Sequence, residues 1–187
     1  YIKYFKSMKK IISVCVFCSS SNYIDKKYIN AAYNLGKILS INNYTTVYGG
    51  GNTGMMGKLA NSCINYNGKI IGVIPKFLKE RKALHHNLTK VYIENNMHKR
   101  KLRMYELSDI FICLPGGLGT LDEFIEVLEW KQLGIHNKKI VLINIDNYWK
   151  NVLKLFDDMN NKKFTYSNTD NLFYVIDNIE EIVSILN

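Results

Sequence analysis

The chain has 187 residues, 47% of them hydrophobic and 22% charged, which is typical of a globular protein and excludes a disordered or fibrous one. Its length fits a single domain, and none of its apolar runs reaches the roughly 20 residues that cross a bilayer, so we expect no membrane partner. The 25 Lys and Arg exceed the 16 Asp and Glu, which would suit nucleic acid or an anionic ligand. The lysines are scattered as on a solvated surface, however, and we expect no nucleic-acid partner.

The N-terminal segment resembles a secretory signal in its order of residues. Lys9 and Lys10 precede an apolar run over 11–18, and serines follow the run. The run is at the short end for a signal peptide, whereas soluble α/β proteins often begin with such a buried strand. We interpret the run as a strand, residues 1–10 as an N-terminal extension with Met8 as the natural start, and the protein as cytoplasmic.

The four cysteines do not form a recognisable framework. Cys15 and Cys18 lie inside the apolar run, and Cys63 and Cys113 stand alone. A zinc site needs a second closely spaced pair, and a thioredoxin-like motif needs cysteines that open a helix. We therefore predict reduced thiols in the core of a cytosolic protein and disfavour a redox or metal site.

Short β-branched runs alternate with longer amphipathic ones along the rest of the chain. Strands are predicted at 11–17, 45–48, 69–74, 90–93, 110–114 and 140–145, with a weaker one at 173–176. Helices are predicted at 25–41, 55–66, 97–107, 121–133, 148–159 and 179–186. Val, Ile and Leu dominate both faces of the strands, as they do where helices cover a parallel sheet on both sides. The alternation predicts an α/β, doubly wound fold within one domain over 11–187.

Eight of the 12 glycines fall in two loops, and each loop follows a predicted strand. The first loop spans 49–57 and the second 116–119. In an open parallel sheet, ligands bind at the carboxyl ends of the strands, where glycine lets backbone N–H groups approach a phosphate closely. The two loops therefore predict a ligand that carries a phosphate.

The first glycine loop fits the G-x-G-x-x-G pattern of dinucleotide-binding proteins at 49–54, but the match alone is weak. That fingerprint normally follows the first strand and needs an acidic residue at the end of the next one to hold the ribose. Here the next strand runs into Pro75 and Lys76, with no carboxylate in place. NAD binding is therefore disfavoured, and the sequence lacks the pattern of a P-loop NTPase.

The second glycine loop belongs to a longer motif, because residues 115–123 read PGGLGTLDE. Thr120 and Glu123 have the spacing of a capping box, in which Thr120 is the N-cap and Glu123 the third helical residue. A Glu in the first turn also projects towards whatever lies at the N-terminus of the helix. The spacing therefore leaves both a capping and a catalytic role open for Glu123.

A basic run over 97–101 opens the helix predicted at 97–107. It could be an exposed basic turn, but cations at a helix N-terminus oppose the macrodipole unless an anion is bound nearby. The chain keeps only three arginines against many lysines, Arg81, Arg100 and Arg103, and a guanidinium can grip a phosphate or carboxylate in bidentate fashion. A cationic pair, a glycine loop and a carboxylate together predict a site for a phosphorylated sugar or nucleotide.

Taken together, these motifs resemble the LOG ("lonely guy") family of cytokinin riboside 5'-monophosphate phosphoribohydrolases. Residues 115–123 look like its P-G-G-x-G-T-x-x-E signature, and residues 97–101 look like its M-H-x-R-K motif. The similarity extends over nearly everything from about residue 11 to 160. The sequence departs from the family pattern at Ser19, where Gly is usual, at Lys82, where Glu is frequent, and at Glu129, where Thr is frequent. The last two positions concern the substrate pocket.

The resemblance implies a Rossmann-like fold, a homodimer, and hydrolysis of the N-glycosidic bond of a nucleoside 5'-monophosphate, without cofactor or metal. The products would be ribose 5-phosphate and a free base, notably an N6-substituted adenine. The resemblance makes Arg100 and Glu123 the catalytic pair. The residues that it places at the substrate are Ser20, Gly50, Gly51, Lys82, Met97, Lys101, Gly116, Gly117, Leu118, Gly119, Thr120 and Asp122.

The residues are consistent with this chemistry. N-glycoside cleavage passes through an oxocarbenium-like sugar, which a carboxylate can stabilise while it orients or deprotonates water. Glu123 suits this task better than Asp122, which should point about 100° away around the helix. Arg100 has two open roles, as a clamp on the phosphate or as support for the departing base.

Two other functions are alternatives to hydrolysis of the N-glycosidic bond. The first is a non-catalytic nucleotide-binding protein of the same fold, in which Glu123 only caps its helix. The second is the older label of the family, lysine decarboxylase, which needs a lysine that forms a Schiff base with pyridoxal phosphate. No feature of the sequence singles out such a lysine.

Overall fold

The computed structural model describes residues 13–165 and 168–186. The predicted N-terminal extension over 1–10, including Met8, lies outside the described residues. Within them, no helix combines the length and the apolar character that a bilayer span requires.

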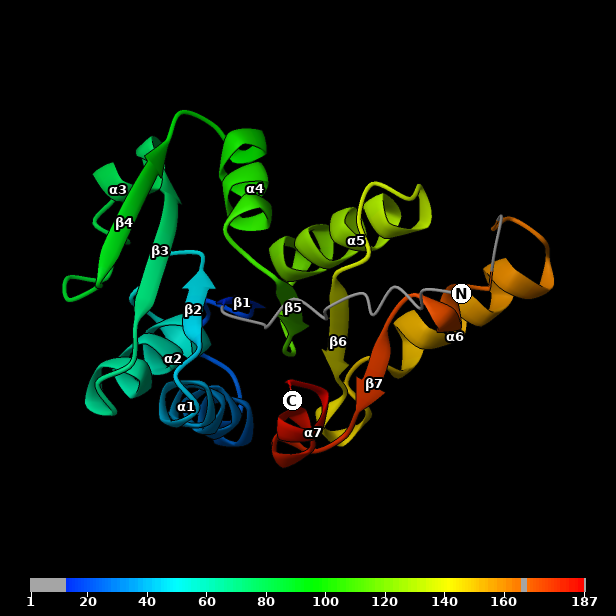
Figure 1. The fold of residues 1–187 in the computed structure, drawn as a ribbon, viewed down its shortest axis with the longest axis horizontal. Coiled ribbons are helices and arrows are strands. Elements are labelled where there is room, and N and C mark those ends of the chain that lie inside the picture. The colour runs from blue at the N-terminus through cyan, green and yellow to red at the C-terminus, as the bar shows by residue number, and fades with distance from the viewer. Residues whose placement is uncertain (1–12, 166–167, 187) are drawn as a thin grey trace, which may run out of the picture.

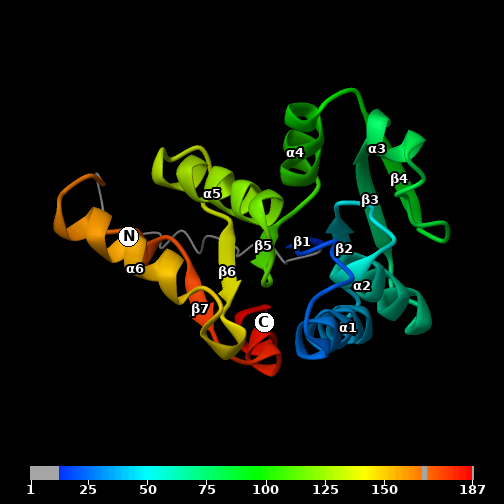
Figure 2. The ribbon, with the colours of Figure 1, turned by 180° about the vertical axis from the view of Figure 1, so that it is seen from behind.

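Seven parallel strands form one sheet in the order β4-β3-β2-β1-β5-β6-β7 (Figures 1 and 2). From β1 the chain builds outward to β4, then returns to place β5 on the other side of β1. The sheet therefore has its topological switch point between β1 and β5, and the predicted doubly wound fold is confirmed. The strands are β1 Ser13–Phe17, β2 Thr45–Tyr48, β3 Ile70–Pro75, β4 Lys90–Glu94, β5 Ile110–Cys113, β6 Lys139–Ile143 and β7 Tyr174–Ile176.

Helices cover both faces of the sheet. Figure 1 shows α1, α2 and α7 gathered on one side and α4 and α5 on the other. The helices are α1 Lys26–Ile41, α2 Gly54–Asn65, α3 Lys76–Glu80, α4 Met97–Glu106, α5 Leu118–Gln132, α6 Lys150–Asn161 and α7 Ile182–Leu186, with 3-10 turns at Ile145–Asn147, Thr169–Asn171 and Ile179–Glu181.

The alternation of side chains along the strands divides the core in two. In β1, Val14 and Val16 pack in the core beneath α1, α2 and α7, whereas Cys15 and Phe17 pack in the core beneath α4, α5 and α6. Successive side chains of a strand point to opposite faces, so a strand buried on both faces must be apolar throughout. This explains the continuous apolar runs in the sequence.

All four cysteines are free and buried, as predicted for core thiols. Cys18 and Cys63 lie in the core under α1 and α2, and Cys15 and Cys113 lie in the core under α4 and α5. Burial raises the pKa of each thiol.

The predicted capping box is wrong. Helix α5 begins at Leu118, three residues before the predicted start, and its N-cap is Gly117. Thr120 is therefore the third helical residue and Glu123 the sixth, a full turn too deep to cap the helix. The reason is that the first two helical residues, Leu118 and Gly119, are exposed, so the apolar periodicity begins only after them and predicts a later start.

Several other boundaries differ from the prediction by one to three residues. Strand β6 ends at Ile143, because the side chain of Asn144 turns to accept the N–H of Trp149 at 2.9 Å and a 3-10 turn follows. Helix α6 accordingly begins at Lys150 and not at residue 148. The five-residue helix α3 was not predicted, since one turn and a half is too short to show a helical period.

Candidate active site

A cleft of about 430 Å³ opens at the carboxyl ends of β1 and β5, at the switch point of the sheet. Open α/β sheets bind their ligands at this place because the two connecting loops diverge there. The cleft is lined by the loop after β1, the start of α5, the inward face of α4, and one side chain each from α2 and α3. The lining residues are Cys18, Ser19, Ser20, Ser21, Met56, Leu78, Met97, Arg100, Gly117, Leu118, Gly119, Thr120 and Glu123.

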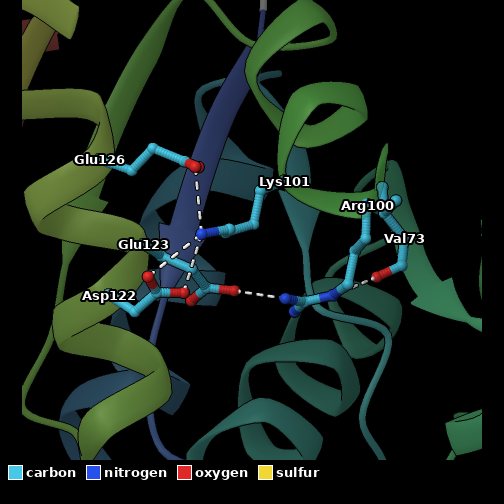
Figure 3. Close-up of polar contacts among 6 residues, drawn as sticks. All are labelled: Val73, Arg100, Lys101, Asp122, Glu123 and Glu126. Atoms are coloured by element: carbon cyan, nitrogen blue, oxygen red, sulfur yellow. Dashed lines mark hydrogen bonds and ion pairs between the residues drawn. The ribbon is translucent and has the colours of Figure 1, made fainter. Parts of the chain in front are cut away.

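An ion pair between Arg100 and Glu123 lies in the wall of this cleft (Figure 3). The Nη1 group of Arg100 donates to Oε1 of Glu123 at 2.6 Å, and its Nε group donates to the carbonyl of Val73 at 3.1 Å. Both side chains are about 95% buried within the chain. The guanidinium is thus fixed by β3 on one side and by α5 on the other.

Burial governs the protonation of Glu123. Removal of the carboxyl group from water raises its pKa, and the positive charge and hydrogen bond of Arg100 oppose this rise without cancelling it. A carboxylate with a raised pKa is a stronger base than an exposed one. Perturbed carboxyl groups of this kind, in a cleft and beside a single charged partner, are common at catalytic sites.

Local sequence explains how Arg100 reaches this position. Asn96 caps α4, because its side-chain oxygen accepts the backbone N–H of Lys99 at 2.9 Å, so the helix begins where predicted. Arg100 then lies one turn into the helix, on the face directed at the sheet. A Cβ atom at Gly49 would collide with the guanidinium, so the first glycine loop leaves the space that Arg100 occupies.

The N-terminus of α5 forms a second part of the cleft wall. The first N–H groups of a helix have no acceptor within the helix, and they carry a partial positive charge that attracts anions. Here they belong to Leu118, Gly119 and Thr120, all of which line the cleft. Thr120 is buried against Gly116, where a Cβ atom would lie 2.5 Å from the Cβ of Thr120.

The structure brings most of the predicted site residues together. Ser20, Met97, Arg100, Gly117, Leu118, Gly119, Thr120 and Glu123 all line the same cleft. Gly116 lies just behind it, in a smaller apolar hollow of about 250 Å³ that shares Ser19, Ser21 and Gly117 with the cleft.

Besides Gly116, five predicted residues lie outside the lining of the cleft. Gly50 and Gly51 hold the loop after α3, since the carbonyl of Gly50 accepts the N–H of His85 and Gly51 bridges Leu84. Lys82 follows α3 as an exposed residue with a φ of 58°, and its role in substrate recognition remains a prediction. The other two, Lys101 and Asp122, pair with each other between α4 and α5.

The sequence reading did not assign Cys18, Ser19, Ser21, Met56 and Leu78 to the site. The first three directly follow β1 at the switch point, so the predicted topology could have pointed to them. Met56 and Leu78 carry no polar chemistry, and Leu78 belongs to the unpredicted helix α3. They supply the apolar part of the lining.

The arrangement can bind an anion at the start of α5 and present a carboxylate beside a guanidinium a short distance deeper in the same cleft. The carboxylate can accept a proton or stabilise a developing positive charge. Among the described residues, no three His, Cys, Asp or Glu side chains group as metal ligands would.

Comparison with known proteins finds a matching family and several relatives. Residues 56–186 match the family model described as "Possible lysine decarboxylase". The chain is 44% identical over 151 residues to "Probable cytokinin riboside 5'-monophosphate phosphoribohydrolase LOGL6" of Oryza sativa subsp. japonica, a match that covers 81% of this chain and 60% of the rice protein. It is 39% identical over 170 residues to "Cytokinin riboside 5'-monophosphate phosphoribohydrolase LOG4" of Arabidopsis thaliana, covering 91% of this chain and 79% of that protein.

Solved structures with the same fold are more distant in sequence. The molybdenum cofactor binding protein from the phototrophic bacterium Rippkaea orientalis superimposes with a TM-score of 0.71 at 21% identity, covering 96% of this chain and 97% of that one. At this identity the likeness concerns the fold alone. The described sheet and its helices are thus shared with proteins of a different stated ligand.

Proposed function

Since this chain belongs to the LOG family, we propose that it hydrolyses the N-glycosidic bond of a nucleoside 5'-monophosphate. The proposed substrates are AMP and N6-substituted AMP, and the products are the free base and ribose 5-phosphate. The observation that carries the proposal is the buried pair of Arg100 and Glu123 beside the N-terminus of α5, in one cleft.

The proposed mechanism assigns a part of the substrate to each wall of the cleft. The 5'-phosphate binds the N–H groups at the start of α5. The ribose then lies over Glu123, and the base extends towards the apolar Met56 and Leu78. The C1'–N bond breaks and its electron pair leaves on the base, while the carboxylate of Glu123 stabilises the oxocarbenium-like sugar.

Water completes the reaction. Its oxygen forms the new bond to C1', Glu123 accepts the proton that the water loses, and the base takes up a proton as it departs. Arg100 orients Glu123 through the contact at 2.6 Å and opposes the rise in the pKa of Glu123 that burial causes. This places Arg100 with the reacting groups and leaves the phosphate to the helix N-terminus.

The test is to incubate the protein with AMP and with N6-isopentenyl-AMP, without added cofactor, and to separate the products by chromatography. We expect free base and ribose 5-phosphate in equal amounts. Binding of either nucleotide without release of base would make the protein a nucleotide-binding protein and overturn the proposed hydrolysis. Glu123→Gln serves as the control for contaminating hydrolase.

The proposal extends to a homodimer. It is supported by the resemblance to the family and by exposed apolar side chains on α5 and α4: Leu118 is 86% exposed and Leu102 is 45% exposed. Light scattering after size exclusion measures the mass directly, and a monomer at micromolar concentration would contradict the proposal.

A cytoplasmic location is part of the same proposal. Four free cysteines are typical of a reducing compartment, because oxidising compartments favour disulfides. Fractionation of the source cells with an antibody against the chain would test it.

A further inference from the structure

We infer that Lys101 is a positioning residue, which ties α4 to α5 and so holds Arg100 in register with Glu123; this inference rests on the proposed function. The resemblance places Lys101 at the substrate, but its ammonium group is engaged elsewhere. The Nζ atom lies 3.1 and 2.9 Å from the two carboxylate oxygens of Asp122 and 3.1 Å from Oε1 of Glu126 (Figure 3).

These contacts occupy the whole donor capacity of the ammonium group. A lysine has three N–H donors, and here three carboxylate oxygens lie within reach of them. The Lys101 side chain is only 10% exposed, and it is absent from the lining of the cleft. A substrate phosphate would have to displace a carboxylate to be bound by Lys101.

The two helices need such a tie because their apolar anchorage is small where the site lies. Within α4 only Arg100 and Met104 are buried. At the start of α5, Leu118 is 86% exposed, and no atom lies within 4 Å of a Cβ added at Gly117 or Gly119. Apolar packing therefore fixes neither the first turn of α4 nor the first three residues of α5, whose apolar anchors, Leu121 and Phe124, come later in the helix. Polar contacts must contribute at the start of both helices.

The order of residues makes the tie specific for the catalytic pair. Lys101 directly follows Arg100, and Asp122 directly precedes Glu123. Asp122 and Glu126 are four residues apart, so they lie on one face of α5 and receive the lysine together. A rotation or slide of α5 that moved Glu123 away from Arg100 would also break the contacts of Lys101. Misplacement of a reacting group by about 1 Å can cost on the order of 100-fold in rate.

The experiment compares three ways to break or restore the tie. Lys101→Met removes the cation and keeps the length of the side chain, the double variant Asp122→Asn and Glu126→Gln removes its partners, and Lys101→Arg restores a cation. Arg103→Met is the matched control, because Arg103 is another paired cation of α4, bound to Glu94 and Glu106 away from α5.

We expect Lys101→Met and the double variant to lower kcat by about 10- to 100-fold while KM for AMP changes less than about threefold. Lys101→Arg should recover most of the activity, and Arg103→Met should leave kcat within about twofold. A triple variant that combines Lys101→Met with the double variant carries no unpaired charge at these positions. It should be no slower than Lys101→Met, because all these changes remove the same interaction.

A direct contact between Lys101 and the substrate predicts a different pattern. In that case Lys101→Met would raise KM at unchanged kcat, and the double variant, which frees the lysine, would not lower kcat. Either result overturns the inference. Hydrogen exchange distinguishes a failure of this inference from a failure of the proposed function. Faster exchange of the α4 amides in Lys101→Met than in Arg103→Met supports the tie even in a protein without hydrolase activity. Equal exchange in the two variants refutes the tie.

Discussion

Glu123 is buried beside the positive charge of Arg100. A neutral residue in its place can therefore test its role in the reaction separately from its effect on stability. Burial raises the pKa of Glu123, so the folded protein accommodates a neutral side chain at this position at least as well as a carboxylate. We therefore expect Glu123→Gln to lower hydrolysis by at least about 100-fold and to keep the melting temperature within about 3 °C. Activity within a few-fold of the wild type would disprove the role of Glu123 as base.

Arg100 offers a test of geometry at constant charge. Its guanidinium reaches Val73 and Glu123 with two different nitrogens, at 3.1 and 2.6 Å, and a lysine has a single nitrogen for both. We expect Arg100→Lys to lower kcat/KM by about 10-fold or more, which corresponds to at least about 1.4 kcal/mol of lost transition-state stabilisation.

The matched change one turn further along α4 is Arg103→Lys. Arg103 is 40% exposed and pairs with Glu94 and Glu106 outside the cleft, so this change should leave kcat/KM nearly unaltered. Equal losses in both variants would show that Arg100 supports only the helix and not the reaction.

The same carboxyl group predicts the pH dependence of the reaction. Its pKa is raised in the folded protein, so the folded state binds the proton more tightly than the unfolded state does. The ionised form that acts as base is therefore lost at a higher pH than for an ordinary glutamate. We expect the acid limb of the kcat/KM profile, which reports the free enzyme, to lie above pH 4.5, the ordinary value.

The contribution of Glu123 to stability changes with pH in the direction opposite to its contribution to activity. For a raised pKa, the contribution of Glu123 to folding is most favourable when the group is protonated, and it declines as the pH rises from about the ordinary pKa of 4.5 through the raised one. The free energy of unfolding is measured by denaturation at several pH values in this range. The difference between the wild type and Glu123→Gln isolates the contribution of the carboxyl group. A difference that grows more favourable to the wild type with rising pH would contradict the assigned direction.

At the level of elements, the start of α5 depends on the space around each of its glycines. An added methyl group at Gly116 would lie 2.5 Å from the Cβ of Thr120, whereas at Gly119 it would meet no atom within 4 Å. We expect Gly116→Ala to lower the free energy of unfolding by about 1–3 kcal/mol through overpacking. Gly119→Ala should raise it by up to about 1 kcal/mol, since alanine favours the helix. Urea denaturation of both variants tests the pair, and equal effects would refute the packing argument.

The sheet was predictable from the sequence because its strands are buried on both faces. Runs such as Ile110–Cys113 are apolar at every position, and each is bounded by a turn or a helix with its own period. The start of α5 and the end of β6 were not predictable from the sequence, because they depend on particular contacts. Thr120 packs against Gly116, and the side-chain oxygen of Asn144 accepts the N–H of Trp149. Such contacts join residues through the folded backbone, which periodicity does not describe.

The site shows the same division. The proposed catalytic pair and the second glycine loop follow from motifs, and the structure brings them into one cleft. The engagement of Lys101 by Asp122 and Glu126 does not follow from any motif, because it requires the relative rotation of two helices. The apolar side of the cleft, Met56 and Leu78, was also beyond the sequence, since an apolar residue at a ligand looks the same as one in the core.

At the level of the whole molecule, the sheet keeps two apolar layers apart, and each layer contains two of the four thiols. Burial hides these thiols and raises their pKa, and even Cys18, which borders the cleft, is only 1% exposed. A reagent such as iodoacetamide can therefore alkylate them only when a layer opens. We expect all four to react at one common rate, proportional to the globally unfolded population, when intact mass is followed over time in mild denaturant. Earlier labelling of Cys15 and Cys113 would mean that one layer opens before the other.

Alkylation of the buried free thiols therefore reports how often the protein opens spontaneously. A ligand that binds only the folded protein lowers the open population, and labelling slows by the factor 1 + [L]/Kd when closing is fast relative to alkylation. Alkylation timed against added nucleotide would therefore yield the affinity of the cleft for any monophosphate, including those that are never turned over.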